Sequence, residues 1–396
     1  MYQRSKRSGN YRFSQRPKFN GNGGKRNIKT FSDISKFIHR ARDVGQNEIY
    51  QPKTNFENLA IDESLKANIS KKGYTLPTPI QDETITHILA GKDLLGIANT
   101  GTGKTGAFLI PLLNKVLQNP SEQVLIMAPT RELALQIQHE FFSLSSQTGI
   151  SSVLCIGGTS MYQQKDNLSR KYNFVIGTPG RLKDLINQRA LHISSFGSVV
   201  LDEVDRMLDM GFIHDIKTIL SSLPSQRQTL FFSATASGEI LELIHGFSKD
   251  LVTVSVKYTD TAETIDQDIV KFKGSENKLE VLNNLLRQDG FNKVLIFGRT
   301  KHGVRKLSEK LNYSGFRTDS IHGNKSQPQR ERALRSFRQN RVNILVATDV
   351  AARGLDIDGV THVINYDLPE SYENYIHRIG RTGRANHQGK ALTFVE

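Results

Sequence analysis

The sequence predicts an α/β protein with two tandem domains, each a parallel β-sheet flanked by helices, behind a basic N-terminal tail that we expect to be disordered. Its 396 residues are too many for one ordinary domain and suit two. Short apolar runs alternate with longer amphipathic stretches, which is typical of parallel strands joined by helices. Lys and Arg outnumber Asp and Glu by 14 (53 − 39), and nine of these basic residues lie in residues 1–30, which contain no acid.

The tail is the first of four predicted parts. We assign it residues 1–50, including a short amphipathic helix over 31–45 with apolar residues near one face at Phe31, Ile34, Phe37, Ile38 and Ala41. The alternating pattern then predicts the first domain over 51–256 and the second over 269–396, with a polar linker over 257–268 between them.

Apolar runs of four to six residues predict the strands. In the first domain we expect strands at 93–98, 124–128, 152–156, 174–177, 198–201 and 229–233. Helical periodicity covers 131–145 and 180–188. In the second domain we expect strands at 293–297, 317–321, 343–347, 362–366 and 391–395.

The tail also indicates a polyanionic partner. Its basic residues are interleaved with aromatic ones, namely Tyr2, Tyr11, Phe13 and Phe19. Such a mixture suits sequence-tolerant RNA contacts, because arginine attracts phosphates and aromatic rings stack on bases. A tail that only increases solubility is the alternative.

Composition excludes several classes of site. The single cysteine, Cys155, rules out an intrachain disulfide and a thiolate metal cluster, and its apolar neighbours predict a buried strand position. No apolar run approaches the roughly 20 residues that a membrane span needs, and the N-terminus lacks the apolar core of a secretory signal. We therefore expect a cytoplasmic protein without a membrane partner; a mitochondrial transit peptide, which shares the Arg- and Ser-rich composition, stays open.

A phosphate-binding loop follows the first predicted strand. Residues 98–105 read Ala-Asn-Thr-Gly-Thr-Gly-Lys-Thr, a Walker A loop with Ala in place of its first Gly. Glycines let backbone N–H groups approach phosphate oxygens, and a helix N-terminus then faces the anion. We expect Lys104 to reach the β- and γ-phosphates and Thr105 to ligate Mg²⁺. The remaining nucleotide-binding residues predicted here are Thr100, Gly101, Thr102 and Gly103.

Three acids complete the predicted hydrolytic site. Asp202, Glu203 and Asp205 come directly after the apolar run Val199–Leu201, which is the Walker B arrangement. Asp202 is predicted to hold Mg²⁺, and Glu203 to orient and deprotonate the attacking water. The predicted cofactors are therefore ATP and Mg²⁺.

These motifs, with others in order along the chain, give it a family resemblance. From about Phe56 to Glu396 the chain resembles the DEAD-box RNA helicases of superfamily 2, which implies that both domains are RecA-like. Besides the two motifs above, the resemblance rests on Gly73–Gln81, Pro129–Leu133, Gly157–Gly158, Thr178–Arg181, Ser233–Thr235, Phe297–Thr300, Gln327 with Arg330, Thr348–Asp356 and His377–Arg384. One departure is Val204 in the Asp-Glu-Val-Asp motif, where the family has Ala; we expect changed packing and intact chemistry.

The resemblance implies further nucleotide contacts. Gln81 would read the adenine edge with its amide, and Phe56 would stack on the ring. Arg381 and Arg384 would act as arginine fingers on the γ-phosphate, because planar guanidinium groups stabilise charge on a transferred phosphoryl group. From the second domain, the nucleotide would also be contacted by Gly354 and Asp356, the latter at the ribose.

It also implies an RNA site that grips the backbone and distinguishes RNA from DNA through the 2′-OH. The residues it assigns to RNA binding are Thr130, Arg131, Gly158, Thr178 and Arg181 in the first domain and Thr300, Gln327, Arg330 and Thr348 in the second. Salt-bridge or packing roles within a domain are the alternative for Arg131 and Arg330. Coupling between ATP and domain movement is assigned to Asp205, Ser233, Thr235 and His377.

The leading functional prediction is an ATP-dependent RNA helicase that unwinds short duplexes locally and works as a monomer. An ATP-gated RNA clamp with little unwinding would need the same residues, so the sequence does not separate the two. A DNA helicase is disfavoured by Gln81 in its Pro-Thr-Pro-Ile-Gln setting and by the Ser-Ala-Thr motif. The cellular RNA and any ribonucleoprotein partners are not encoded in these motifs.

Overall fold

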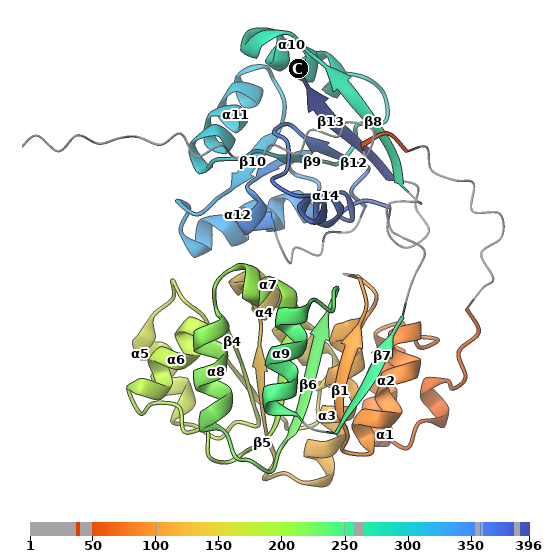
Figure 1. Ribbon diagram of the computed structural model, residues 1–396, viewed down its shortest axis with the longest axis vertical. Helices are drawn as coiled ribbons and strands as arrows, with labels where there is room; N and C mark the ends of the chain where they lie inside the picture. Colours follow the sequence, from red (N-terminus) through yellow and green to blue (C-terminus); the bar gives the residue numbers. More distant parts are fainter. Residues whose placement is uncertain are drawn as a thin grey trace, which may run out of the picture.

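The computed structural model consists of two α/β domains stacked one above the other (Figure 1). It describes residues 37–39, 50–99, 101–248, 250–256, 265–352, 357, 359–383 and 389–396. This architecture confirms the predicted fold class of two tandem domains with parallel sheets.

The first domain is built on a seven-stranded parallel sheet in the order β3-β4-β2-β5-β6-β1-β7. Its strands are β1 (Asp93–Ile97), β2 (Gln123–Met127), β3 (Ser152–Cys155), β4 (Phe174–Gly177), β5 (Phe196–Asp202), β6 (Gln228–Ser233) and β7 (Leu251–Ser255). Short helix η2 (Phe56–Asn58) precedes α1 (Glu63–Lys71), α2 (Pro79–Leu89), α3 (Lys104–Gln118), α4 (Arg131–Leu144), α5 (Met161–Leu168), α6 (Pro179–Asn187), α7 (Val204–Asp209), α8 (Ile213–Ser222) and α9 (Gly238–Phe247). The helices cover both faces, so the central strands are buried on both sides and read as continuous apolar runs.

The second domain carries a six-stranded parallel sheet in the order β10-β11-β9-β12-β13-β8. Its strands are β8 (Ile265–Lys271), β9 (Val294–Phe297), β10 (Thr318–Ile321), β11 (Ile344–Ala347), β12 (His362–Asn365) and β13 (Gly389–Val395). The helices are α10 (Gly274–Leu286), α11 (Lys301–Tyr313), α12 (Gln327–Arg338), α13 (Asp349–Ala352) and α14 (Tyr372–Ile379). Three apolar clusters, two flanking the sheet and one beneath α14, form its core.

Every strand predicted from an apolar run is present, and no end is displaced by more than two residues. Two edge strands, β7 and β8, were not predicted. Strand β8 begins at Ile265, so part of the predicted linker 257–268 lies in the sheet of the second domain, which starts earlier than residue 269. The reason is visible in the sequence of β8, Ile-Asp-Gln-Asp-Ile-Val-Lys, because an edge strand with charged residues gives only a weak apolar signal.

The predicted helix over 31–45 lies largely outside the described residues. Within the described part, Phe37–His39, the backbone of His39 pairs antiparallel with Gln267 of β8, so this point of the segment is strand-like. Residues 1–30, predicted to be disordered, lie outside the described residues altogether.

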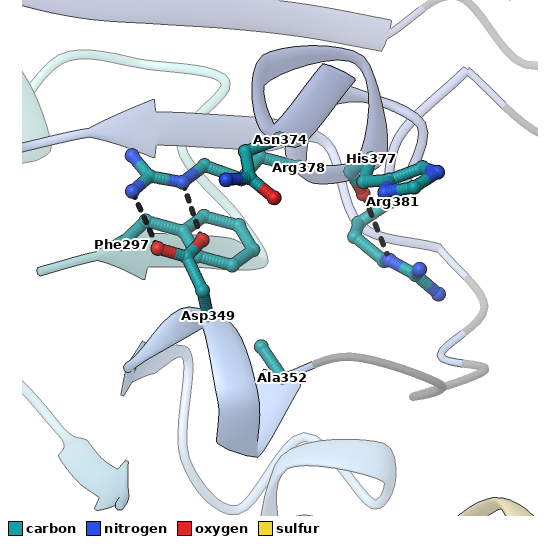
Figure 2. Close-up of a pocket in the computed structure, with 7 residues that line it drawn as sticks. All are labelled: Phe297, Asp349, Ala352, Asn374, His377, Arg378 and Arg381. Carbon is teal, nitrogen blue, oxygen red and sulfur yellow. Dashed lines mark hydrogen bonds and ion pairs between the residues drawn. The ribbon is translucent and has the colours of Figure 1, made fainter. Parts of the chain in front are cut away.

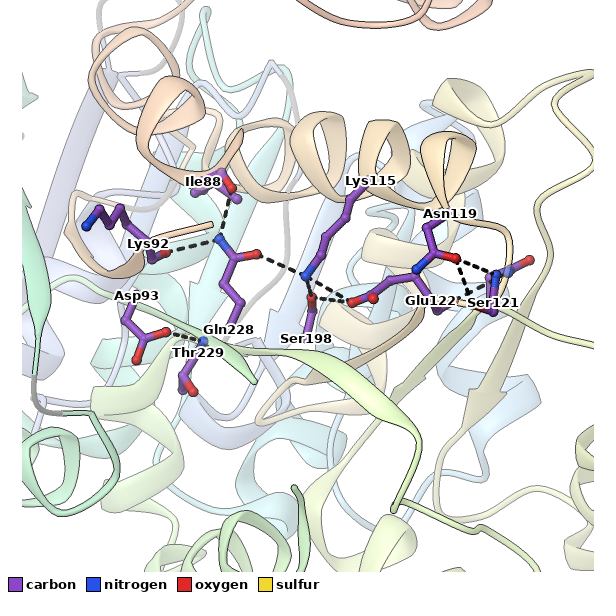
Figure 3. Close-up of polar contacts among 11 residues, drawn as sticks. Ile88, Lys92, Asp93, Lys115, Asn119, Ser121, Glu122, Ser198, Gln228 and Thr229 are labelled. Atoms are coloured by element: carbon purple, nitrogen blue, oxygen red, sulfur yellow. Dashed lines mark hydrogen bonds and ion pairs between the residues drawn. The ribbon is translucent and has the colours of Figure 1, made fainter. Parts of the chain in front are cut away.

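A partly buried polar network connects elements of the first domain at the amino ends of its strands (Figure 3). Lys115, near the end of α3, donates to Ser198 of β5 at 2.7 Å and pairs with Glu122 at 3.0 Å. It also lies 3.4 Å from the Gln228 side chain of β6. Because α3, β5 and β6 carry at their other ends the predicted phosphate-binding, acidic and coupling residues, respectively, this network holds three elements of the site in register.

Candidate nucleotide and RNA site

The phosphate-binding loop connects the carboxyl end of β1 to the start of α3. Gly101 and Gly103 have φ angles of +81° and +91°, in the left-handed region where a side chain would be strained. Lys104 is the first residue of α3 and is 6% exposed, and its Nζ donates to the Ala98 carbonyl at 2.9 Å. The loop thus places a lysine and a helix N-terminus together; Thr100 lies outside the described residues.

Gln81 of α2 packs directly on this loop. Its Nε2 donates to the Gly103 carbonyl at 3.0 Å, and its Oε1 accepts from the backbone N–H of Thr78 at 3.0 Å. A Cβ at Gly103 would lie 2.7 Å from Gln81 Nε2, so only glycine allows this approach. Phe56 is buried and stacks against Tyr74 with ring centroids 6.2 Å apart. The adenine contacts of Gln81 and Phe56 stay predictions.

Asp202 ends strand β5 beside the phosphate-binding loop and is 2% exposed. Its Oδ1 is buried and has no hydrogen-bond partner among the described residues. Burial raises the pKa of Asp202, helped by Glu203 and opposed by Lys104. A buried carboxylate oxygen without a partner, next to a phosphate loop, fits a ligand to a divalent cation.

Glu203 follows in a strained backbone conformation, with a φ of +54°. Its carboxylate pairs with the guanidinium of Arg206, and both side chains are almost completely buried. The sequence prediction missed Arg206, although an acid followed three residues later by arginine at the start of a helix is a recognisable signal. Arg206 fixes the orientation of the predicted general base.

Asp205 is tied to the neighbouring strand. Its Oδ2 accepts from the backbone N–H of Ala234, at 3.0 Å, just beyond β6. Ser233 Oγ accepts from the Thr235 N–H at 3.4 Å. The structure thus brings together the acidic motif and the Ser-Ala-Thr motif, two of the groups to which coupling was assigned.

The second domain faces this site with α14. Burial and the charge of Arg206 lower the pKa of His377, against the opposing effect of Asp205, so charges of the acidic motif in the first domain act on this imidazole. A small pocket beneath α14 is lined by Phe297, Asp349, Ala352, Asn374, His377, Arg378 and Arg381 (Figure 2).

Two arginines of this pocket have different surroundings. Arg378 holds Asp349 through two bonds, of 2.6 and 2.8 Å, and is an internal brace that the sequence did not predict. Arg381 Nε donates to the His377 carbonyl at 3.2 Å, and in Figure 2 its guanidinium points away from the Arg378–Asp349 pair. Arg384, Gly354 and Asp356 lie outside the described residues.

The predicted RNA residues of the first domain lie after β2, β3 and β4. Thr130 caps α4 by accepting from the Leu133 N–H at 3.2 Å, and Thr178 directly precedes α6. The Arg131 guanidinium packs so closely over Gly158 that a Cβ there would overlap it. Arg181 Nη1 donates to the backbone carbonyl of Thr159, the residue after Gly158, at 3.4 Å. Helix starts, a glycine turn and two arginines therefore share one edge of the sheet.

In the second domain the predicted RNA residues follow β9, β10 and β11. Thr300 caps α11 by accepting from the Gly303 N–H at 3.0 Å, and Thr348 directly precedes α13. Gln327 and Arg330, on α12, both contact Glu132 of the first domain, at 3.3 and 3.0 Å. The salt bridge considered for Arg330 therefore exists, but it crosses between the domains.

Glu132 was missed as a site residue because its partners lie almost 200 positions away in the sequence. It is 4% exposed. Three arginines lie close to one another near Glu132. Burial lowers the pKa of Arg131, and the nearby charges of Arg330 and Arg181 lower it further. An electropositive cluster shared by two domains suits an anionic backbone.

Comparison with known proteins agrees with this geometry. The DEAD/DEAH box helicase family model matches residues 78–243, and the Helicase conserved C-terminal domain matches residues 277–386. The ATP-dependent RNA helicase CshA of Limosilactobacillus reuteri is 43% identical over 342 residues, which cover 86% of this chain and 69% of that protein. The chain belongs to the DEAD-box ATP-dependent RNA helicase family.

Other DEAD-box relatives extend the comparison. CshA of Listeria monocytogenes is 45% identical over 87% of this chain and 66% of its own length. This chain therefore spans about two thirds of the length of these relatives. Saccharomyces cerevisiae Dbp5 bound to RNA and ADP BeF3 superimposes with a TM-score of 0.77 at 30% identity, covering 86% of this chain and 89% of that one. A DEAD box protein from Methanococcus jannaschii gives 0.51 at 38% identity, covering 86% and 93%.

The departure from the DEAD-box motif is a packing change. Val204 is fully buried in the apolar cluster that includes Met207 and Leu201. Cys155 is buried as predicted, and burial raises the pKa of its thiol to about 12. Within the described ranges, we find no helix with the length and apolar character needed to span a bilayer.

Proposed function

We propose that this chain hydrolyses ATP in the cleft between its domains and uses the cycle to unwind short RNA duplexes locally. The observation that carries the proposal is the division of each sheet into two halves. In the first domain, the carboxyl ends of β1, β5 and β6 carry the nucleotide residues, and those of β2, β3 and β4 carry the RNA residues. In the second domain, RNA residues follow β9, β10 and β11, and α14 follows β12. Ligands of parallel α/β sheets bind at such carboxyl ends.

On the nucleotide half, the phosphate-loop amides and Lys104 bind the phosphates. Asp202 and Thr105 are the residues that would hold Mg²⁺, and a bound Mg²⁺ neutralises charge on the transferred phosphoryl group. Glu203, oriented by its pairing with Arg206, accepts a proton from the attacking water. Burial of these groups keeps bulk water away from the reacting atoms.

The second domain completes the site. Arg381, and Arg384 by its place in the motif, stabilise charge on the γ-phosphate as guanidinium donors. The charges of Arg206 and Asp205 act on His377, so α14 lies within electrostatic reach of the acidic motif and would respond to a change of charge there. ATP turnover then depends on both domains, which is what links it to movement.

On the RNA half, backbone N–H groups at helix starts, threonine hydroxyls and arginines grip the strand without reading bases. Contacts with the 2′-OH favour RNA over DNA. The basic tail of residues 1–30 adds sequence-independent attraction. We propose that the protein acts as a monomer in the cytoplasm.

The test is ATP turnover with single-stranded RNA and with DNA of the same sequence, beside strand displacement from a short RNA duplex. Stimulation by RNA alone, with ATP-dependent displacement, is the expected outcome. Stimulated turnover without displacement would indicate the RNA clamp instead. Equal stimulation by DNA would overturn the proposed substrate, and turnover independent of any nucleic acid would overturn the coupling.

A further inference from the structure

A segment before the first domain lies on the second domain. Figure 1 shows this short piece, residues 37–39, beside β8 of the second domain. The helices that follow it in the sequence, α1 and α2, lie in the other domain. Residues near the start of the chain therefore pack on a domain that begins more than 220 residues later. The nucleotide and RNA sites described above do not use this contact.

The contact has an apolar anchor. Phe37 is fully buried in a cluster with Ile265, Tyr375, Ile379 and Ala391, which come from β8, α14 and β13. Its ring meets Tyr375 edge-on, with centroids 4.7 Å apart. An aromatic ring enclosed by three elements is a specific fit and differs from a chain lying on a surface.

The contact also has a backbone anchor. The His39 N–H donates to the Gln267 carbonyl at 3.1 Å, and the Gln267 N–H donates to the His39 carbonyl at 2.7 Å. These reciprocal bonds occupy the outer edge of β8, the last strand of its sheet. Inside the same contact, the Tyr375 hydroxyl donates to Gln267 Oε1 at 2.9 Å. Addition to an exposed edge with a side chain in a pocket is a known mode of peptide recognition.

The chain is fastened again in the first domain. The Tyr50 hydroxyl donates to the carboxylate of Asp82, which also accepts from the backbone N–H of Lys53 at 2.8 Å. Asp82 is adjacent to Gln81 on α2, the helix that packs on the phosphate loop. His39 and Tyr50 are 11 residues apart (50 − 39), and a fully extended chain of that length spans at most about 40 Å.

We propose that Phe37–His39 docks in cis onto the face formed by β8, β13 and α14, and that this docking limits how far the two domains separate. The domains are then joined in two ways: by the covalent connection between β7 and β8, and by the chain that leads from Tyr50 back to the segment docked non-covalently on the second domain. The docked face includes the back of α14, which carries His377, so the restraint acts on the helix that faces the nucleotide site. A second tether raises the effective concentration of one domain for the other.

The test uses the full chain without ATP or RNA, so its outcome does not depend on helicase activity. Phe37→Ala removes the apolar anchor, and Ile38→Ala is the matched control, because Ile38 is the next residue and is 45% exposed. His39→Pro removes the N–H donor and leaves the pocket intact. Hydrogen exchange measures how well the backbone amide of Gln267 is protected. Domain separation is measured as the distance between two dyes attached at Ser143→Cys and Tyr313→Cys, one exposed position in each domain.

We expect Phe37→Ala and His39→Pro to speed Gln267 exchange roughly tenfold or more, since local opening then exposes the amide. Both should also move the dye pair to longer, more broadly distributed distances, with Ile38→Ala like the parent protein. Unchanged exchange in both variants would show that the segment does not dock. Faster exchange with an unchanged distance distribution would overturn the restraint. Protection that disappears on dilution of the protein would show docking between two copies instead.

Discussion

The proposed nucleotide half and the proposed RNA half of the site differ in the contacts that connect the two domains. On the RNA half, Glu132 of one domain bonds directly to Gln327 and Arg330 of the other. On the nucleotide half, the charges of Arg206 and Asp205 act on His377 of α14. The RNA half therefore closes partly through the protein's own ion pair, whereas the nucleotide half presents charges arranged for phosphates. We therefore expect loss of a nucleotide-side residue to abolish ATP hydrolysis, and loss of an RNA-side residue to weaken RNA binding.

The largest effect is expected at the arginine finger. Arg381→Lys keeps the charge but loses the planar guanidinium, so ATP turnover should fall by roughly 10³–10⁵-fold. ATP affinity should change little, because the phosphate loop lies in the first domain. Steady-state turnover and binding of a fluorescent ATP analogue measure the two. Turnover near that of the parent would mean that the active site is not shared between domains.

Glu203→Gln comes next. Without a general base, turnover should drop by about 10²–10⁴-fold while ATP and RNA still bind. A single-turnover assay with prebound ATP isolates the chemical step. Asp166→Asn, at an exposed ion pair on α5, serves as the control and should hydrolyse ATP like the parent. Retained turnover in Glu203→Gln would remove this residue from the mechanism.

Deletion of residues 1–30 should weaken RNA binding and leave ATP hydrolysis unchanged. These residues carry nine basic side chains and no acid, so RNA affinity at low salt should fall roughly tenfold. The slope of log affinity against log salt should become shallower by about 0.7 for each phosphate of a single strand that the shortened protein no longer neutralises. Salt titrations of both proteins decide this, with turnover at saturating RNA expected to match. Superimposable titrations would leave the tail a solubilising role only.

The smallest effect is expected at the interdomain ion pair. Glu132→Gln should raise the RNA concentration for half-maximal ATPase about fivefold, close to 1 kcal/mol, and leave the maximal rate unchanged. Glu140→Gln is the matched control, because Glu140 pairs with Lys72 and Tyr74 inside the first domain. A double-mutant cycle with Arg330→Gln should show that the two changes are not additive. Additive effects would mean that this ion pair does not form during turnover.

Some features were determined by the sequence alone. The phosphate loop, the acidic motif and the core strands were predicted within a residue or two, because each depends on neighbours along the chain: glycines before a lysine, acids after an apolar run, apolar residues in a buried strand. The fold class followed from the same local patterns. Cys155 was likewise predicted to be buried from its apolar neighbours, and it is.

Other features were decided only by the tertiary structure. Glu132 could not be paired with Arg330 in advance, because which charges meet across a cleft depends on how two sheets face each other. Strand β8 escaped prediction because pairing with β13 compensates for its weak apolar pattern. Phe37 belongs to neither domain by sequence position, yet it is buried in the second. In each case the stabilising partner lies far along the chain, and the interaction exists only because folding brings distant segments together.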